Sequence, residues 1–166
     1  MKHLSYLFCL GWLAAWLVAC DGKSSFITDA SYRSLVEQDF RKKQVLMPQG
    51  DLFAILDTLL TDYERGALQF LYAYMPLADI TDYPGDFHLM NVRASMRAMD
   101  EMPWGQTVPE DLFRHFVLPV RVNNEPLDSA RVVFYDELKP RVQQLSMYDA
   151  VLEVNHWCHE KAVYQP

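Results

Sequence analysis

The sequence predicts a mainly α-helical fold, and three observations lead to this prediction. Apolar residues recur at helical spacing, as in Ala67, Phe70, Leu71 and Tyr74, which places them on one buried face. Stop signals such as Pro48-Gln49-Gly50 separate the helical segments. No two segments show the alternating pattern of paired strands. The chain has 166 residues, 51% hydrophobic and 22% charged, which is enough for one domain with its own core.

Residues 1–19 are predicted to be a signal peptide. Lys2 precedes an apolar run from Leu4 to Ala19, which is short for a membrane span but typical of a signal peptide. The run ends in Leu17, Val18, Ala19 and Cys20. This end resembles the bacterial lipobox, in which a small residue precedes a cysteine that is acylated. An ordinary cleaved signal, or an anchor helix with an incidental cysteine, is the alternative.

The lipobox resemblance implies that acylated Cys20, carrying palmitate or a similar chain, binds membrane lipid, because each buried methylene favours the bilayer. The protein would then be a lipoprotein of the bacterial cell envelope, on its periplasmic side or at the cell surface. Residues 20–31 are small and polar and would form the tether. Without Lys2 the net charge falls from −7 to about −8. An acidic chain with no basic cluster argues against nucleic acid as a partner, and no motif indicates a cofactor.

Residues 32–116 are expected to form a helical N-terminal region. The first helix begins near Tyr32, a second covers 52–60 with Asp51 as its N-cap, and a third follows Thr61. The segment 79–86 is expected to be a loop before a helix over 87–102. Thr107 and Glu110 have the spacing of a capping box for a short helix over 111–116.

Residues 117–127 contain prolines and β-branched residues, which favour an extended strap. Helices are predicted again over 128–166, with Pro140 ending or kinking the first of them. Ser146 is expected to cap the last helix. The expected buried face of that helix comprises Met147, Ala150, Val151, Val154, Trp157 and Cys158.

The last helix carries two candidate sites, and neither is assigned a function. Cys158 could be a nucleophile, but flanking His156 and His159 lie on other sides of a helix, and the C-terminal end of a helix does not favour a thiolate. Cys158 is therefore expected to pack in the core. Glu153, His156 and His159 lie a turn apart, but a metal site on such helices needs a second helix of this kind. No catalytic and no metal residue is predicted.

Two segments resemble bacterial transglutaminase-like proteins, relatives of the papain-type cysteine hydrolases. They are the strap that begins at Val117 and the helix with Trp157, His159, Glu160 and Tyr164, which in that family precedes the nucleophile loop. The resemblance implies a mainly α chain that ends in the first helix of a transglutaminase-like α+β core, with the rest of that core missing. It also implies acyl transfer or amide hydrolysis on a protein or peptide substrate, by a Cys-His-Asp triad. No member of that triad can be placed on residues 1–166, so these activities and substrates belong to a full-length parent.

Two hypotheses follow. The chain is the truncated N-terminal part of such a protein, inactive by itself, or it is a stand-alone lipid-anchored helical module that binds a protein or glycan. The first predicts an exposed apolar face on the last helix. The second predicts that Trp157, Val154 and Val151 are all buried, so the exposure of Trp157 should distinguish the two.

Overall fold

The fold is mainly α-helical, as the sequence predicts. A computed structural model describes residues 25–162 except 49, 122 and 124, and no strand occurs among them. The α-helices are α1 (Ala30–Leu46), α2 (Asp62–Tyr74), α3 (Leu77–Asp82), α4 (Gly85–Glu101), α5 (Glu110–Leu112), α6 (Ala130–Val142) and α7 (Met147–Lys161). Short 3₁₀ segments are η1 (Ala54–Asp57) and η2 (Gly105–Thr107), and η3 (Phe113–Val117) is a π-helical turn.

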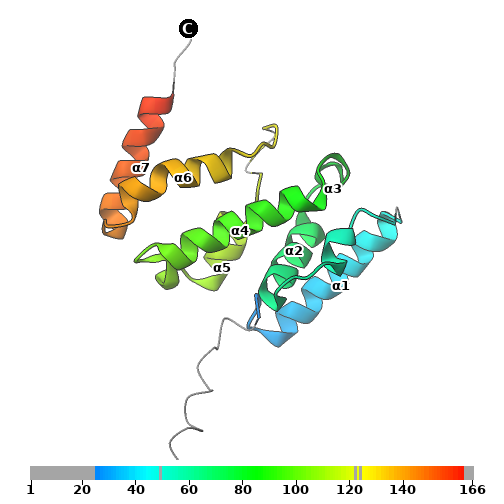
Figure 1. Cartoon of the computed structure of the whole chain (residues 1–166). Coiled ribbons are helices and arrows are strands. Elements are labelled where there is room, and N and C mark those ends of the chain that lie inside the picture. Colours follow the sequence, from blue (N-terminus) through cyan, green and yellow to red (C-terminus); the bar gives the residue numbers. More distant parts are fainter. Residues whose placement is uncertain (1–24, 49, 122, 124, 163–166) are drawn as a thin grey trace, which may run out of the picture.

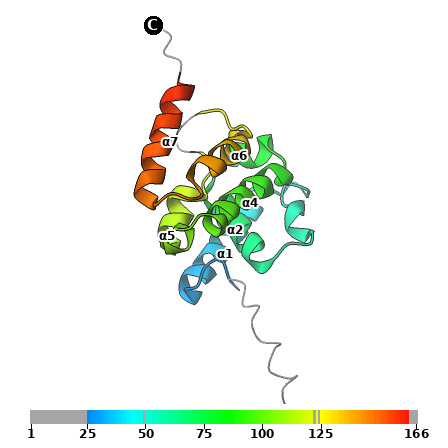
Figure 2. The same ribbon diagram turned by 60° about the vertical axis from the view of Figure 1, so that its left-hand side comes forward.

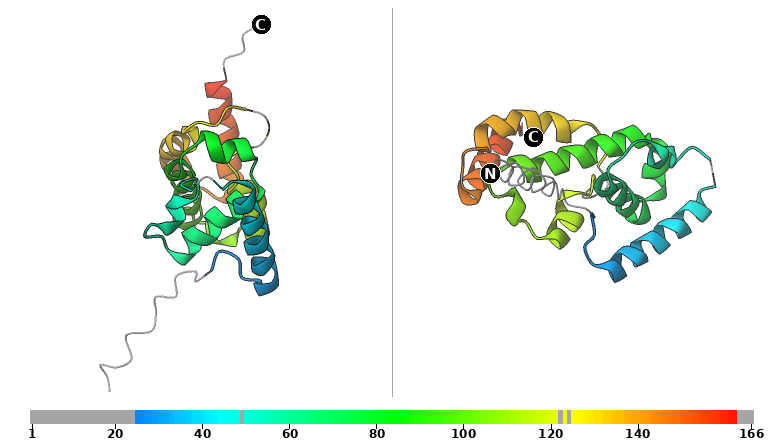
Figure 3. Two further views of the ribbon diagram at one scale, coloured as in Figure 1. Left: turned by 90° about the vertical axis from the view of Figure 1, so that its right-hand side faces the viewer. Right: turned by 60° about the horizontal axis from the view of Figure 1, so that its bottom comes forward.

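Helix α4 is the central element. It contacts α2 on one side and α6 on the other, and α1 packs on α2 while α7 packs on α6 (Figure 1). Figure 3 shows α6 running beside α4. In Figure 2, α7 lies at the outside of the molecule, beyond α6. The chain therefore forms two helical layers around α4, and α7 is the outermost helix on its side.

The two layers have separate hydrophobic clusters of different size. The larger one joins α1, α2, α3, α4 and η3, and contains the fully buried Leu68, Tyr72 and Val92. The smaller one holds only four buried residues, Met102, Tyr135, Val142 and Ala150. Because burial of apolar area is the main stabilising term, the α6–α7 hairpin is the less firmly held part of the fold.

Three local predictions are wrong. Residues 52–60 do not form an α-helix but a turn and the short η1. The expected loop 79–86 contains most of α3, whose Asp79 and Ile80 are buried against neighbouring elements. Tertiary contacts, which local propensity does not include, decide both segments.

The third error concerns the capping box at Thr107. Its hydroxyl donates to the Trp104 carbonyl at 2.6 Å, and α5 begins at Glu110 after an uncapped Pro109. A complete capping box occurs instead at Thr61 and Glu64, at the start of α2. Both threonines precede a glutamate by three residues, and only the conformation of the following turn distinguishes them.

The second half of the chain follows the predicted order of elements. Residues 118–121 and 125–128 have no helix or strand, and α6 starts after Ser129. Helix α6 does not end at Pro140 but continues to Val142. The proline lies in the last turn, and its missing N–H removes one hydrogen bond, to the carbonyl of residue 136, without ending the helix there. Ser146 caps α7 as predicted, accepting a hydrogen bond from the Asp149 amide.

Candidate functional site

Trp157 fixes α7 to α6. Only 6% of its surface is exposed, and its ring meets the Phe134 ring edge to face at a centroid distance of 4.9 Å. Its indole N–H donates to Glu137 Oε2 at 3.3 Å. The Lys161 ammonium lies 5.5 Å from the indole ring and 2.6 Å from the same carboxylate oxygen. Trp157, which the sequence analysis placed in the transglutaminase-like motif, therefore stabilises the packing of α7 on α6.

Arg141 makes the second connection between the two helices. Its Nε lies 2.5 Å from Glu153 Oε1, and one of its terminal nitrogens lies 2.8 Å from Glu160 Oε2. The two carboxylates raise the pKa of Arg141, with Glu160 the larger cause. The hydrogen bond from Arg141 lowers the pKa of Glu160 in turn. Glu160 thus has a structural role here, while His159 beside it is exposed and Tyr164 lies outside the described residues.

The expected buried face of α7 is correct only in part. Ala150 and Trp157 are buried and Val154 is half-buried, but Met147, Val151 and Cys158 are exposed. The reason is that α7 contacts α6 partly through charged side chains, Glu153 and Glu160 with Arg141 and Lys161 with Glu137. The side of α7 that faces α6 therefore comprises Ala150 and Trp157 together with the charged Glu153 and Glu160, and the other edge of the apolar stripe is exposed.

Cys158 is a free and exposed thiol, so the prediction of a core cysteine is wrong. The helical spacing still places His156 and His159 on other sides of α7. His156 instead lies 3.0 Å from Glu160, through its Nε2. Cys158 is therefore accessible, with no general base beside it on its own helix.

Glu153 and His156, two of the three candidate metal ligands, contact charged side chains, whereas His159 is exposed. Glu153 pairs with Arg141, and His156 lies against Glu160. Among the described residues, no group of three His, Cys, Asp or Glu side chains could hold a metal ion. The carboxylates of α7 serve the helix–helix contact.

The outward side of α7 is unusual because it has no Asp, Glu, Lys or Arg. Two adjacent stripes at helical spacing form it, and we call them the outer face: Met147, Val151 and Cys158, and Tyr148, Leu152, Asn155 and His159. Tyr148 is 71% exposed and Val151 is 62% exposed. A solvated helix normally carries charges on this side, so the outer face has the composition of a covered surface.

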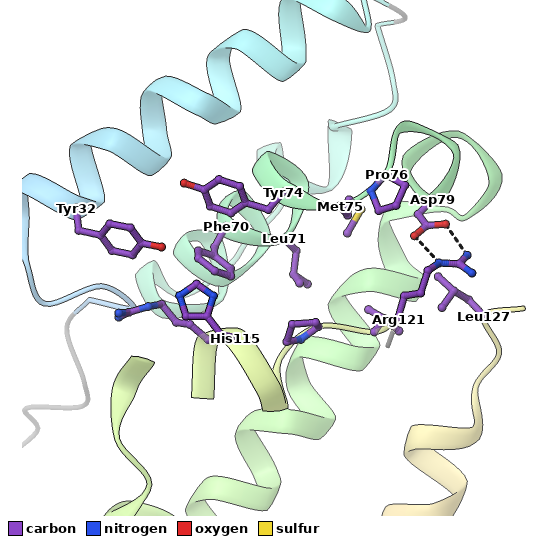
Figure 4. Close-up of a pocket in the computed structure, with 13 residues that line it drawn as sticks. Tyr32, Phe70, Leu71, Tyr74, Met75, Pro76, Asp79, His115, Arg121 and Leu127 are labelled. Carbon is purple, nitrogen blue, oxygen red and sulfur yellow. Dashed lines mark hydrogen bonds and ion pairs between the residues drawn. The ribbon is translucent and has the colours of Figure 1, made fainter. Parts of the chain in front are cut away.

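A cavity of about 460 Å³ lies on the opposite half of the molecule. It is formed where α1, the end of α2, η3 and the 118–127 segment meet (Figure 4). Most of its wall is aliphatic or aromatic, and its charged or ionisable side chains other than tyrosine are Asp79, Arg114, His115 and Arg121. The other lining residues are Tyr32, Phe70, Leu71, Tyr74, Met75, Pro76, Pro119, Val120 and Leu127. Its size and apolar walls are typical of small-ligand sites.

An ion pair closes one end of this cavity. Arg121 donates from Nε to Asp79 Oδ2 at 3.0 Å and from a terminal nitrogen to Oδ1 at 2.6 Å (Figure 4). Asp79 is 4% exposed, and its backbone carbonyl accepts from His88 Nε2 at 3.2 Å. The hydrogen bonds to Asp79 raise the pKa of Arg121. The pair therefore fixes Arg121 to α3.

Tyr32 and His115 line the wall at the other end (Figure 4). Arg114 is also a lining residue of this cavity. It pairs with Glu110 one helical turn earlier, and its guanidinium lies 5.0 Å from the Tyr32 ring centroid. Its Nε is buried and has no hydrogen-bond partner among the described residues. No sequence pattern indicates this cavity, because its lining residues are spread from Tyr32 to Leu127. The Glu110–Arg114 pair, four residues apart on one helix, is the part of the site that local spacing could suggest.

The predicted lipobox and Cys20 lie outside the described residues. Within the described part, no helix is long and apolar enough to cross a membrane. No family model matches the chain, and neither a curated protein nor a solved structure matches it.

Proposed function

We propose that this chain is the lipid-anchored, N-terminal helical region of a transglutaminase-like protein of the bacterial cell envelope. In this proposal, acylated Cys20 holds the region at the membrane, and residues beyond these 166 carry the acyl-transfer or amide-hydrolysis chemistry. The helices of residues 25–162 would position the catalytic core, and the outer face of α7 would be the surface that contacts it. The region itself would have no catalytic activity.

The observation that carries this proposal is the uncharged outer face of α7. Burying Tyr148, Val151 and Leu152 against a second body would remove apolar area from water that the isolated helices leave exposed. Trp157, His159 and Glu160 resemble the helix that precedes the catalytic core in transglutaminase-like proteins, and this supports the same assignment. In such a protein the segment that follows α7 would cover the outer face. Trp157 itself is buried on α6, which is the result that the alternative hypothesis predicts, so the proposal depends on the exposed residues beside it.

Cys158 gives a direct test, since it lies on the outer face and is an exposed thiol. The reading frame beyond Pro166 is sequenced, and the chain is expressed with and without the segment that follows. We expect a Gly-x-Cys-Gly-type loop in that segment, and at least about tenfold slower labelling of Cys158 by a maleimide in the longer protein, as for a thiol that becomes buried.

A matched control distinguishes local burial from a general change in reactivity. Leu59 is fully exposed beyond η1, so a thiol introduced by Leu59→Cys should react at the same rate in both proteins. Peptide mapping of the label distinguishes Cys158 from the thiols of the segment that follows Pro166. A stop codon directly after Pro166, or equal labelling of Cys158 in both proteins, would refute the proposal.

The second candidate is a stand-alone binding module, and two observations favour it. Trp157 is buried, as that hypothesis predicts, and the cavity near Arg114 is a possible ligand site. The exposure of Val151 contradicts its expectation of a closed bundle. Equal labelling of Cys158 in both proteins would favour this candidate.

A further inference from the structure

Ser25, the first described residue, lies at the end of the molecule where α1 and α2 both begin. Its hydroxyl and the Ile27 carbonyl accept hydrogen bonds from Arg33 of α1, at 2.8 and 3.1 Å. A cavity of about 260 Å³ is lined by Ser25 together with Asp62 and Arg65 in the first turn of α2. In Figure 1 the start of α1 lies at the bottom of the molecule, and the end of α7 lies at the top.

This position limits where a lipid on Cys20 could lie. Ser25 follows Cys20 by five residues, and a fully extended chain of that length spans at most about 18 Å. Helix α1 has 17 residues and is longer, about 25 Å. With Cys20 acylated, as in the proposed function on which this inference rests, the bilayer surface lies within that reach of the start of α1.

The outward side of α1 does not suit a helix that lies flat on lipid. It is lined by exposed Ser31, Ser34, Gln38 and Arg41, with Leu35 among them. Helices that lie in a bilayer surface place an apolar face, rich in large side chains, against the lipid. The polar side of α1 therefore favours an orientation in which the start of α1, and not its length, faces the bilayer.

Leu59 is an apolar side chain that this orientation brings to the bilayer. It lies between η1 and α2 and is 100% exposed. The preceding residue, Thr58, is held at the start of α2, because its carbonyl accepts from Arg65 at 3.4 Å. Arg65 also donates to the Leu56 carbonyl. Insertion into the apolar boundary of a bilayer would remove the whole Leu59 side chain from water.

The charges at this end permit such a contact. Arg33 and Arg65 donate to neutral oxygens, and neither forms an ion pair with a described residue. Their positive charges favour lipid phosphates, in a chain whose net charge of −7 does not. Asp57 and Asp62 are exposed on either side of Leu59. The contact should therefore be weak by itself and depend on the high effective concentration that the anchor provides.

We propose that the end of the molecule formed by the starts of α1 and α2 faces the bilayer, with the Leu59 side chain inserted into its apolar boundary. The end of α7 then lies on the far side of the molecule (Figure 1). The segment that follows α7 would be held away from the membrane surface.

Quenching of tryptophan fluorescence by brominated lipid tests this orientation, because bromine on the acyl chains quenches a tryptophan that reaches them. The predicted mature chain, which begins at Cys20, carries Cys158→Ser so that Cys20 is its one thiol. It is coupled through Cys20 to a maleimide lipid in vesicles of phosphatidylethanolamine, phosphatidylglycerol and brominated phosphatidylcholine. Leu59→Trp is compared with Val45→Trp at the far end of α1 and His159→Trp near the end of α7, which are exposed positions.

We expect bromination to reduce the fluorescence that Leu59→Trp adds by at least about twofold, because tryptophan prefers the boundary of a bilayer. The fluorescence that Val45→Trp and His159→Trp add should not change. The protein without these changes supplies the baseline from Trp104 and Trp157. Circular dichroism establishes that each variant is folded.

Quenching at position 45 or 159 that equals or exceeds quenching at position 59 would overturn the proposed orientation, and so would the absence of quenching at all three positions. Because the lipid is attached chemically, neither result depends on acylation in a cell. Failure of the proposed function would appear in other measurements, as a stop codon after Pro166 or as a Cys20 that cells do not acylate.

Discussion

Thr61 makes the only complete capping box among the described helices. Its hydroxyl accepts from the Glu64 amide at 3.1 Å, and Glu64 Oε2 accepts from the Thr61 amide at 2.9 Å. Glu64 is also held by Arg93 of α4, whose Nε lies 2.7 Å from Oε1. The cap therefore connects the start of α2 to the central helix.

Replacing Thr61 by alanine should cost about 1 kcal/mol of folding free energy, the usual value for a lost N-cap. Thr107→Ala is the matched control, because its hydroxyl only donates to the Trp104 carbonyl in a 3₁₀ turn. The control should cost less than about 0.5 kcal/mol. Urea unfolding monitored by circular dichroism measures both, and an equal loss in the two variants would contradict this account of the caps.

His88 is a second residue with a measurable consequence. It is fully buried between Tyr72 and Phe87, and burial lowers its pKa below the ordinary value of 6.5. The unfolded chain therefore binds a proton at a pH where the folded protein does not. By linkage, the stability contribution of neutral His88 is complete above pH 6.5 and decreases as the pH falls below it.

We expect the urea midpoint to decrease between pH 7.5 and pH 5.5, and His88→Phe to remove most of that decrease. His159→Gln, at an exposed position on α7, should retain it. If the urea midpoint of the unmodified protein does not change over this range, the pKa of His88 in the folded protein is not lowered.

At the scale of elements, few side chains connect α7 to α6. Trp157, Arg141 and Lys161 make the hairpin's main side-chain connections, and the cluster beneath it has only four buried residues. The larger cluster around α2 and α4 does not include Trp157. Helix α7 should therefore open separately from the rest of the molecule, whereas Arg131, Tyr135 and Lys139 hold α6 to α4.

Trp157→Ala tests this separation. We expect a loss of about 3 kcal/mol, with faster amide hydrogen exchange in α7 and unchanged exchange in α1, α2 and the first turns of α4. Val151→Ala, an exposed position on the same helix, should change stability by less than about 0.5 kcal/mol. Uniformly faster exchange throughout the chain would show that the molecule is a single cooperative unit.

At the scale of the whole molecule, a net charge of −7 does not favour binding to anionic lipid. Membrane attachment would therefore depend on Cys20. In a bacterial host supplied with an alkyne-tagged palmitate analogue, we expect the chain to incorporate the label and to fractionate with membranes. Cys20→Ser should lose the label, whereas Cys9→Ser, within the predicted signal peptide, should retain it. A labelled Cys20→Ser protein would disprove lipidation at this position.

Local sequence signals determined the mainly helical class, the apolar stripe of α2 and the cap of α7, because helical periodicity and capping depend on residues within a few positions of one another. They could not distinguish Thr61 from Thr107, or identify α3, because the outcome depends on contacts between distant segments. The tertiary structure alone decided which side of α7 is exposed, since that depends on the packing of Trp157 on α6 and on the ion pairs with Arg141 and Glu137. It also decided the cavity, whose lining side chains extend from Tyr32 to Leu127 and meet only after folding.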